Sequence, residues 1–449
     1  MSWRSGLVVG AAVAVILPTA VFYGYLVREE QLPPYEAMEE LHYRLRKSEL
    51  RDLVFRMRGK QRGTWHRADS PPGANTGALD ADSVEQLAAI GYLAGSEVAP
   101  GRSGVTFNST ASAPGFNLYN SGHRPEATLM DMDGEVLHRW QLPFEEAFPG
   151  HELPAGSTAH EHWRRVLLLP NGDLLAIHEG LGLLRIDKDS NLLWSNANGA
   201  HHDVSIAADG RIWALTRIAH INLSYNEKRP ILEDYVSVLS PQGQDIASFS
   251  ILDAFQRSHF SPLLENADRS GDIFHTNSLE ILDGRFTGRS SALADGRALL
   301  SLNHLNLVAI MDLEELDILW TLSGFSIHQH DAELTPDGNL LFLDNTGHAG
   351  YSKVVEIDPT SQELVWAYFG DEQNGFLTAT SGAQQRLPNG NTLIIESNAG
   401  RAFEVNPGGD IVWEFYNPHR AGDDDELIAT LFDVQRIEPD FPLDWLERR

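Results

Sequence analysis

Apolar positions in the larger part of this chain fall into short runs that are separated by turn sequences at a nearly regular interval. From residue 115 onward one unit recurs: an aliphatic residue, Asp or a substitute, a turn, further aliphatic residues and a closing aromatic residue. Its six copies close at Trp140, Trp194, Phe249, Trp320, Trp366 and Trp413. Each copy predicts two outer strands joined by a tight turn, with the aromatic side chain filling the space between neighbouring sheets.

A second unit lies between the copies of the first and consists of a strand, an Asp-Gly or Asn-Gly turn and another strand. Its five copies are LLLPNGDLLAI, SIAADGRIWAL, ALADGRALLSL, ELTPDGNLLFL and QRLPNGNTLII. The two units together supply four strands per repeat, which is the blade of a β-propeller. The fold class is therefore all-β, with a six-bladed β-propeller over residues 113–449.

The sixth inner strand is missing between the repeats, and the C-terminus offers a candidate for it. The sequence LFDVQRIEP at 431–439 is similar to SGAQQRLPNG at 381–390. We expect this C-terminal strand to complete the blade whose other strands come from residues 115–142. Such a mixed blade closes the ring and leaves no open sheet edge.

The N-terminal segment has a different pattern, because residues 7–27 contain no charge and are long enough to span a bilayer as a helix. We predict an uncleaved transmembrane anchor over residues 1–28, with the body in the periplasm or another extracytoplasmic space. A cleaved signal segment is the alternative, but Pro18 lies where a small residue is wanted. The basic run at 44–62 partly opposes export of the body.

Residues 29–67 predict an amphipathic helical stalk, because Leu41, Leu45, Leu53 and Met57 recur near helical spacing. A solvated stalk packed on the body is the simplest interpretation; self-association into a homo-oligomer and contact with a lipid surface are the alternatives. Residues 68–112 are rich in Pro, Gly, Ser, Ala and Asp and predict a linker. One short helix interrupts this linker after the capping box that begins at Ser83.

Charge separates the two parts of the chain. Residues 1–67 hold 11 Lys and Arg against 7 Asp and Glu, and the remainder holds 23 against 56. An acidic body of this kind excludes nucleic acid as a partner, since that function needs a basic face. The absence of cysteine excludes disulfides and thiolate chemistry.

Three histidines occupy matching positions in neighbouring blades. The residue eight positions before the turn glycine is His202 in one blade and His330 in another, and a count of nine gives His275 in the blade between them. The same position holds Arg164 and Gly382 elsewhere. Because the first strand of a propeller blade lines the central channel, these histidines are predicted to face a common axis; separate hydrogen-bonded core histidines are the alternative.

Histidine can act as a metal ligand, a general acid or base, or a nucleophile. With Asp203 and Asp331 adjacent, the three could hold a divalent metal. Spacing alone does not bring side chains from separate blades within bonding distance, so we predict neither a metal nor another cofactor. A fourth histidine, His328, lies outside the shared register and nearer the loop.

The stretches GFNLYNSGHRPEATLMDMDGEVLHRW, HHDVSIAADG, FHTNSLEIL and HQHDAELTPDGNLLFLDN, in this order and spacing, resemble the bacterial arylsulfotransferases, the PAPS-independent aryl-sulfate sulfotransferases. The resemblance covers residues 115–438. It implies a six-bladed propeller that moves a sulfuryl group from an aryl sulfate to a phenolic acceptor through a sulfohistidine.

The resemblance also implies roles for individual residues. The nucleophile falls on His330, and the supporting histidines fall on His202 and His275. Their task is to neutralise the charge that spreads over the sulfuryl oxygens and the leaving phenolate. Four further residues are expected to contact the substrate: His304, Asn303, His328 and Asn277.

One position departs from the family pattern. The family has an arginine in the strand after the FHTNS segment, whereas this chain has Asn303 there, and His304 or Arg297 would have to replace the lost charge. This departure keeps a second function class open: a catalytically idle, membrane-anchored propeller that binds a ligand or a protein partner.

Two other sequence features say less about function. The acidic run DDDE at 423–426 is interpreted as a solvated loop, with calcium binding as the alternative. The repeated tryptophans are similar to those of quinone-dependent dehydrogenase propellers, but the glycine-rich docking signature of those enzymes is missing. We therefore assign the tryptophans to packing between blades.

Overall fold

The computed structural model describes residues 65–67, 102–153, 157–348, 350–370, 376–422 and 425–446. One compact unit, Gln61–Glu152 with Thr158–Arg449, holds the propeller. The predicted anchor at 1–28, the short helix after Ser83, and most of the stalk and linker lie outside the described residues. None of the helices in the described ranges is long and apolar enough to span a membrane.

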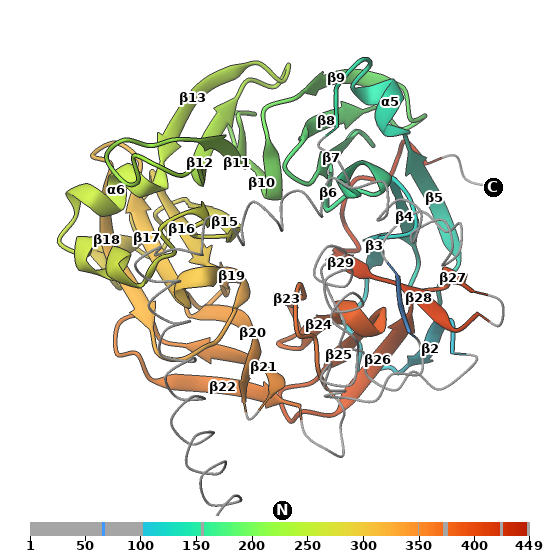
Figure 1. The fold of residues 1–449 in the computed structure, drawn as a ribbon. Helices are drawn as coiled ribbons and strands as arrows, with labels where there is room; N and C mark the ends of the chain where they lie inside the picture. Colours follow the sequence, from blue (N-terminus) through green and yellow to red (C-terminus); the bar gives the residue numbers. More distant parts are fainter. Residues whose placement is uncertain are drawn as a thin grey trace, which may run out of the picture. The chain divides into compact units, whose positions relative to one another are not determined.

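Six antiparallel sheets stand in a ring, and the innermost strand of each faces the axis (Figure 1). The first blade consists of β29 (Leu431–Ile437), β3 (Phe116–Ser121), β4 (Glu126–Met130) and β5 (Val136–Gln141). The second consists of β6 (Arg165–Leu168), β7 (Leu174–His178), β8 (Gly182–Ile186) and β9 (Leu192–Asn196). The third consists of β10 (Ala200–Ile206), β11 (Ile212–His220), β12 (Ile231–Leu239) and β13 (Asp245–Ser250).

The other three blades repeat this order from the axis outward. The fourth consists of β15 (Thr276–Leu282), β16 (Arg297–Leu302), β17 (Leu307–Asp312) and β18 (Asp317–Ser323). The fifth consists of β19 (His330–Leu334), β20 (Leu340–His348), β21 (Tyr351–Ile357) and β22 (Leu364–Phe369). The sixth consists of β23 (Ala383–Arg386), β24 (Thr392–Glu396), β25 (Arg401–Val405) and β26 (Ile411–Tyr416).

Short elements decorate the ring. The strands among them are β1 (Trp65–Arg67), β2 (Gly104–Asn108) on the outer edge of the sixth blade, β14 (Gly271–Asp272) parallel to β12, β27 (Arg420–Ala421) and β28 (Leu427–Ala429). The α-helices are α5 (Phe144–Ala147) and α6 (Ile251–Arg257). The 3₁₀ turns are η2 (Ala159–Glu161), η3 (Ser261–Asn266), η4 (Ser291–Leu293), η5 (Asn303–Leu305) and η6 (Ser397–Ala399).

Ring closure occurs in the first blade. The segment 431–438, predicted to complete this blade, forms β29 there and pairs antiparallel with β3, for example Val434 opposite Tyr119. Two segments that are far apart in sequence, β3 and β29, thus share one sheet, and the ring is left without an open sheet edge at this blade. Arg436 of β29 adds a buried ion pair across to the sixth blade, with its Nη1 2.9 Å from Glu404 Oε2.

The aromatic residue that closes each repeat lies in the fourth strand of its blade, counted from the axis. Four of the tryptophans use their indole N–H to bond a backbone carbonyl in a turn of the next blade: Trp140 to Gly172, Trp194 to Pro241, Trp366 to Pro407 and Trp413 to Met132. A large apolar ring with one polar edge suits this place, because the ring fills the gap and the N–H finds a partner. The predicted packing between blades is confirmed for these residues.

Several inner strands are irregular near their starts. The register with the second strand shifts between His201 and Val204 in β10, between Thr276 and Ser278 in β15, and after His330 in β19. Left-handed backbone occurs at these places, for example at φ +52° for His202. A β-bulge turns side chains out of the regular alternation and is common beside functional sites.

Candidate active site

The bulged strand starts bring the three predicted histidines to one region near the axis. His202 lies in β10, His275 directly precedes β15, and His330 begins β19. The rings of His202 and His275 meet edge to face with their centroids 4.7 Å apart. The positive charges of Arg164 and His275 both act on His330 and help to lower its pKa.

The proton position on His330 follows from its surroundings. Its Nδ1 lies 2.7 Å from Asn345 Oδ1 and 3.1 Å from the carbonyl oxygen of His328. The amide nitrogen of Asn345 donates to the carbonyls of Thr378 and Ser381, each at 2.7 Å, so its oxygen must face the ring. Both neighbours of Nδ1 therefore accept, Nδ1 carries the proton, and Nε2 holds the free electron pair.

The same ring is neutral at ordinary pH. Burial lowers the pKa of His330 to about 3, helped by the nearby charge of Arg164. A neutral imidazole with a defined unprotonated Nε2 is the reactive form of a histidine nucleophile.

His275 has the opposite character. Its Nδ1 lies 2.6 Å from Asp272 Oδ2, and its backbone N–H donates to Asp272 Oδ1 at 2.9 Å. Burial alone would lower the pKa of His275, but the hydrogen bond and charge of Asp272 outweigh it and raise that pKa above its usual value. His304 stacks on His275 with a centroid distance of 4.9 Å and donates to the carbonyl of Asp272. His275 is therefore the acidic partner of the set.

His202 is buried and neutral. Its Nδ1 lies 2.9 Å from Nδ1 of His201 and 3.3 Å from Glu179 Oε1. Burial holds the pKa of His202 well below its usual value, and the positive charges of His275 and Arg164 lower it further.

Two arginines supply fixed positive charge beside the histidines. Arg164 Nε lies 3.3 Å from Glu179 Oε2, and Arg217 Nη1 lies 3.6 Å from Glu179 Oε1. Two guanidiniums that share one carboxylate leave a surplus positive charge. Arg164 occupies in the second blade the register position that the histidines occupy in theirs, and its charge acts on both His202 and His330.

Arg297 lies elsewhere. It begins β16 opposite Leu282, at the far end of the inner hairpin, and its guanidinium is 3.2 Å from Asp312. Of the two candidates for the lost arginine, only His304 is in this region.

The remaining predicted contact residues hold the segment that precedes His330. The amide nitrogens of Asn277 and Asn303 both donate to the carbonyl of Gln329, at 2.9 and 3.2 Å. The exposed His328 donates from Nδ1 to Asn303 Oδ1 at 3.2 Å. Asn303 is thus part of the scaffold around the nucleophile candidate.

A buried ion cluster adjoins the histidines. Arg165 lies 3.2 Å from Asp203, 2.8 Å from Asp433 and 3.8 Å from Asp331, which come from three other blades. Strict alternation along β19 would point Asp331 to the strand face opposite His330, toward the adjacent blade. Its carboxylate does accept from the N–H of Gln384, but the left-handed backbone at Asp331 also lets it reach Arg165.

Two groups at this site offer three metal-binding atoms within 4.8 Å of one another: Glu179 with His201 and His202, and Asp272 with His275 and His304. Their members are already joined by the hydrogen bonds and ion pairs given above. The arrangement brings together a neutral histidine with a free electron pair, a histidine of raised pKa and two arginines.

Sequence reasoning missed four residues of the site. Asp272 carries a local signal, since it lies three residues before His275. Asn345 ends the quoted stretch that contains His330, but only the fold brings the two together. Glu179 follows β7 and Arg217 lies within β11, and neither carries a motif of its own.

These features define a six-bladed propeller with a histidine and arginine site around its axis. A sequence profile described as arylsulfotransferase (ASST) matches residues 165–418, which is more than half of the chain. The chain belongs to the arylsulfotransferase family. A search of curated proteins found no match.

Solved structures with a similar course of the chain are remote in sequence. A protein of unknown function from Bacteroides caccae has 13% identity and a TM-score of 0.45, covering 71% of this chain and 99% of its own. A streptogramin B lyase has 13% identity and a TM-score of 0.41, covering 75% and 94%. An inactive virginiamycin B lyase from Staphylococcus aureus with quinupristin has 12% identity and a TM-score of 0.40, covering 73% and 98%.

Proposed function

We propose that this protein transfers a sulfuryl group from an aryl sulfate to a phenolic acceptor, with His330 as the covalent carrier. The observation that carries the proposal is the hydrogen bond between His330 Nδ1 and Asn345 Oδ1, which fixes the electron pair on Nε2. Membership of the arylsulfotransferase family supports the same reaction class.

In the first step, the electron pair of His330 Nε2 forms a bond to sulfur while the bond from sulfur to the aryl oxygen breaks. The electrons of that bond leave with the phenolate oxygen, which takes a proton from His275. Because Nδ1 of His330 keeps its proton, the sulfated ring carries a positive charge and is a good leaving group.

In the second step, the acceptor phenol gives its proton to His275, which is now neutral. The acceptor oxygen attacks sulfur, the nitrogen–sulfur bond breaks, and its electrons return to Nε2. The products are the free donor phenol and the sulfated acceptor, and both histidines end in their starting states.

The surplus positive charge of Arg164 and Arg217 supports the transition state. A transferring sulfuryl group presents negatively charged oxygens, and fixed cations in a buried site stabilise them without reorganising. His202 is assigned to hold these oxygens through its Nε2–H, in the tautomer whose Nδ1 accepts from Nδ1–H of His201.

The test uses the purified chain with 4-nitrophenyl sulfate and a phenol acceptor. Release of nitrophenol that depends on the acceptor is expected, and His330→Ala should abolish it while His328→Ala keeps a substantial part. Incubation with donor alone should add one sulfuryl group to the peptide that contains His330. A label on His202 or His275, full activity in His330→Ala, or no turnover with any of several donors would refute the proposal; the last result would favour an idle binding propeller.

Residues 1–28 stay the proposed membrane anchor, supported by the uncharged run at 7–27. With the anchor in place, the body is assigned to an extracytoplasmic space. Protease treatment of intact and opened spheroplasts tests the assignment: a body that is cleaved only after the membrane is opened would contradict it.

A further inference from the structure

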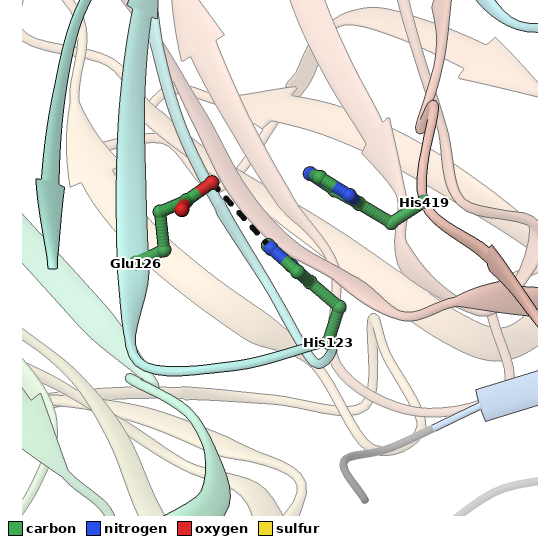
Figure 2. A group of neighbouring side chains, drawn as sticks. All are labelled: His123, Glu126 and His419. Carbon is green, nitrogen blue, oxygen red and sulfur yellow. Dashed lines mark ion pairs between the residues drawn. The ribbon is translucent and has the colours of Figure 1, made fainter. Parts of the chain in front are cut away.

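Outside the candidate active site, a second group of metal-binding side chains lies where the ring closes. His123 and Glu126 flank the turn between β3 and β4 of the first blade, and His419 follows β26 of the sixth. Their candidate ligand atoms all lie within 4.8 Å of one another. Figure 2 shows Glu126 and His123 facing each other, with the ring of His419 beside them.

The polar atoms at the centre of this group are buried but not hydrogen-bonded. Nε2 of His123, Nε2 of His419 and Oε1 of Glu126 are inaccessible to solvent and have no hydrogen-bond partner among the described residues. The Glu126 side chain is only 1% exposed. Three unsatisfied polar atoms that converge cost free energy unless something binds them.

Ion pairs with neighbouring side chains occupy only one of the two carboxylate oxygens of Glu126 at close range. Its Oε2 lies 2.6 Å from Nη2 of the exposed Arg124. Its Oε1 has only distant partners, His123 Nε2 at 3.5 Å and Arg139 Nε at 3.8 Å. One carboxylate oxygen is therefore left to face the two imidazoles.

Both imidazoles can offer a nitrogen to one ion. The rings stack almost in parallel, with centroids 3.4 Å apart, so one ring must tilt for both Nε2 atoms to face the same ion. Each ring has an Nε2 that is buried and without a hydrogen-bond partner among the described residues. His123 Nδ1 bonds Ser121 Oγ at 2.6 Å, the kind of outer partner that orients a histidine ligand and leaves Nε2 for the metal.

The backbone around the group is held in place. His419 donates its N–H to Asn417 Oδ1 at 3.1 Å, and its carbonyl accepts from Ala429. Gly122, beside His123, donates its N–H to the carbonyl of Thr430 at 2.8 Å. His123 also borders a cavity of about 500 Å³.

We propose that His123, Glu126 and His419 bind a divalent transition-metal ion that clamps the first blade to the sixth. Two imidazole nitrogens and one carboxylate oxygen are a ligand set typical of zinc and its neighbours, and water completes the coordination. The ion joins residues almost 300 positions apart in sequence, so it stabilises the closed ring against opening at β29. This site is separate from the proposed sulfuryl transfer.

The test measures zinc in the full chain. The protein is stripped with EDTA, incubated with Zn²⁺, freed of excess ion and analysed by mass spectrometry for metal content. Wild type should hold one more equivalent of zinc than His419→Gln, and Zn²⁺ should raise the Tm of wild type but not of this variant. The loss of affinity should exceed the ~10–100-fold that follows loss of an outer partner.

The matched control is His220→Gln. His220 also pairs with a glutamate, Glu233 at 2.7 Å, but in a complete hydrogen bond, so this variant should bind zinc as wild type does. Equal zinc content in wild type and a folded His419→Gln would overturn the proposal. If that variant does not fold, zinc-soaked wild-type crystals decide: the anomalous difference map must show a peak between the three side chains, and a map without it refutes the site.

Discussion

The amide oxygen of Asn345 accepts the Nδ1 proton of His330 across 2.7 Å. Asn345 is fully buried, and its amide nitrogen is held by two carbonyls of the 378–381 loop. The loop thereby fixes the amide, the amide fixes the proton, and the proton fixes which nitrogen of His330 is nucleophilic. A contact in the fifth blade thus determines the chemistry proposed for the site.

Asn345→Ala should lower kcat roughly 100-fold, because His330 loses the acceptor that selects its reactive tautomer. The readout is acceptor-dependent nitrophenol release, together with the yield of sulfated His330 peptide in the absence of acceptor.

Asn398→Ala is the control for Asn345→Ala, since Asn398 bonds Thr378 and Thr380 of the same loop without touching His330. It should lower the Tm but leave most of the turnover. If both variants lose activity equally, the loop is needed for folding only and the tautomer argument fails.

The acid role of His275 predicts a pH dependence that varies with the donor. Asp272 raises the pKa of His275 above its usual value, so the proton is present below that pKa and is lost as the pH rises through it. Single-turnover rates should therefore fall at high pH, steeply for phenyl sulfate and weakly for 4-nitrophenyl sulfate, whose phenolate needs less help from an acid.

In Asp272→Asn, the fall of the rate at high pH should begin at a lower pH. The reaction of phenyl sulfate should slow about 10²-fold or more, and that of 4-nitrophenyl sulfate should slow less. Parallel pH profiles for the two donors in wild type would rule out His275 as the proton donor.

We expect Arg164 to supply the positive charge that the family's arginine supplies at the position of Asn303. Arg164→Met is expected to lower kcat by roughly 10²–10³, as removal of one charge-stabilising donor commonly does. Steady-state rates of Arg297→Met provide the control: Arg297 pairs with Asp312 away from the histidines, so its loss should leave kcat nearly unchanged. A larger loss of kcat in Arg297→Met than in Arg164→Met would show that Arg297 supplies this charge.

Closure of the ring should be sensitive to Arg436. Its guanidinium bonds Glu404, Asn117 Oδ1 and the carbonyl of Ala113 in the buried seam between the sixth and first blades. Arg436→Met leaves the Glu404 carboxylate without its cation and should lower the free energy of unfolding by about 3 kcal/mol. Urea denaturation measures this loss, and the exposed Arg102→Met, which removes a peripheral pair with Glu414, should cost under about 1 kcal/mol. Equal losses would show that the seam does not depend on this ion pair.

The sequence by itself determined the number and order of the blades. Strands have a side-chain period of two, and their turns favour Asp, Asn and Gly, so repeats such as those ending at Trp140 and Trp413 are visible in one dimension. The same regularity placed His202, His275 and His330 at equivalent points of three inner strands, because register is counted from the turn.

Only the tertiary structure decided how these side chains work. The bulges that turn His202 and Asp331 toward the axis have no sequence signal, since they depend on how each inner strand meets its neighbour. Burial and the charge of Arg164 lower the pKa of His330, whereas Asp272 raises that of His275, and these contacts are made in space regardless of position in the chain. His123 and His419 meet for the same reason: closure of the ring through β29 brings together residues that no local pattern connects.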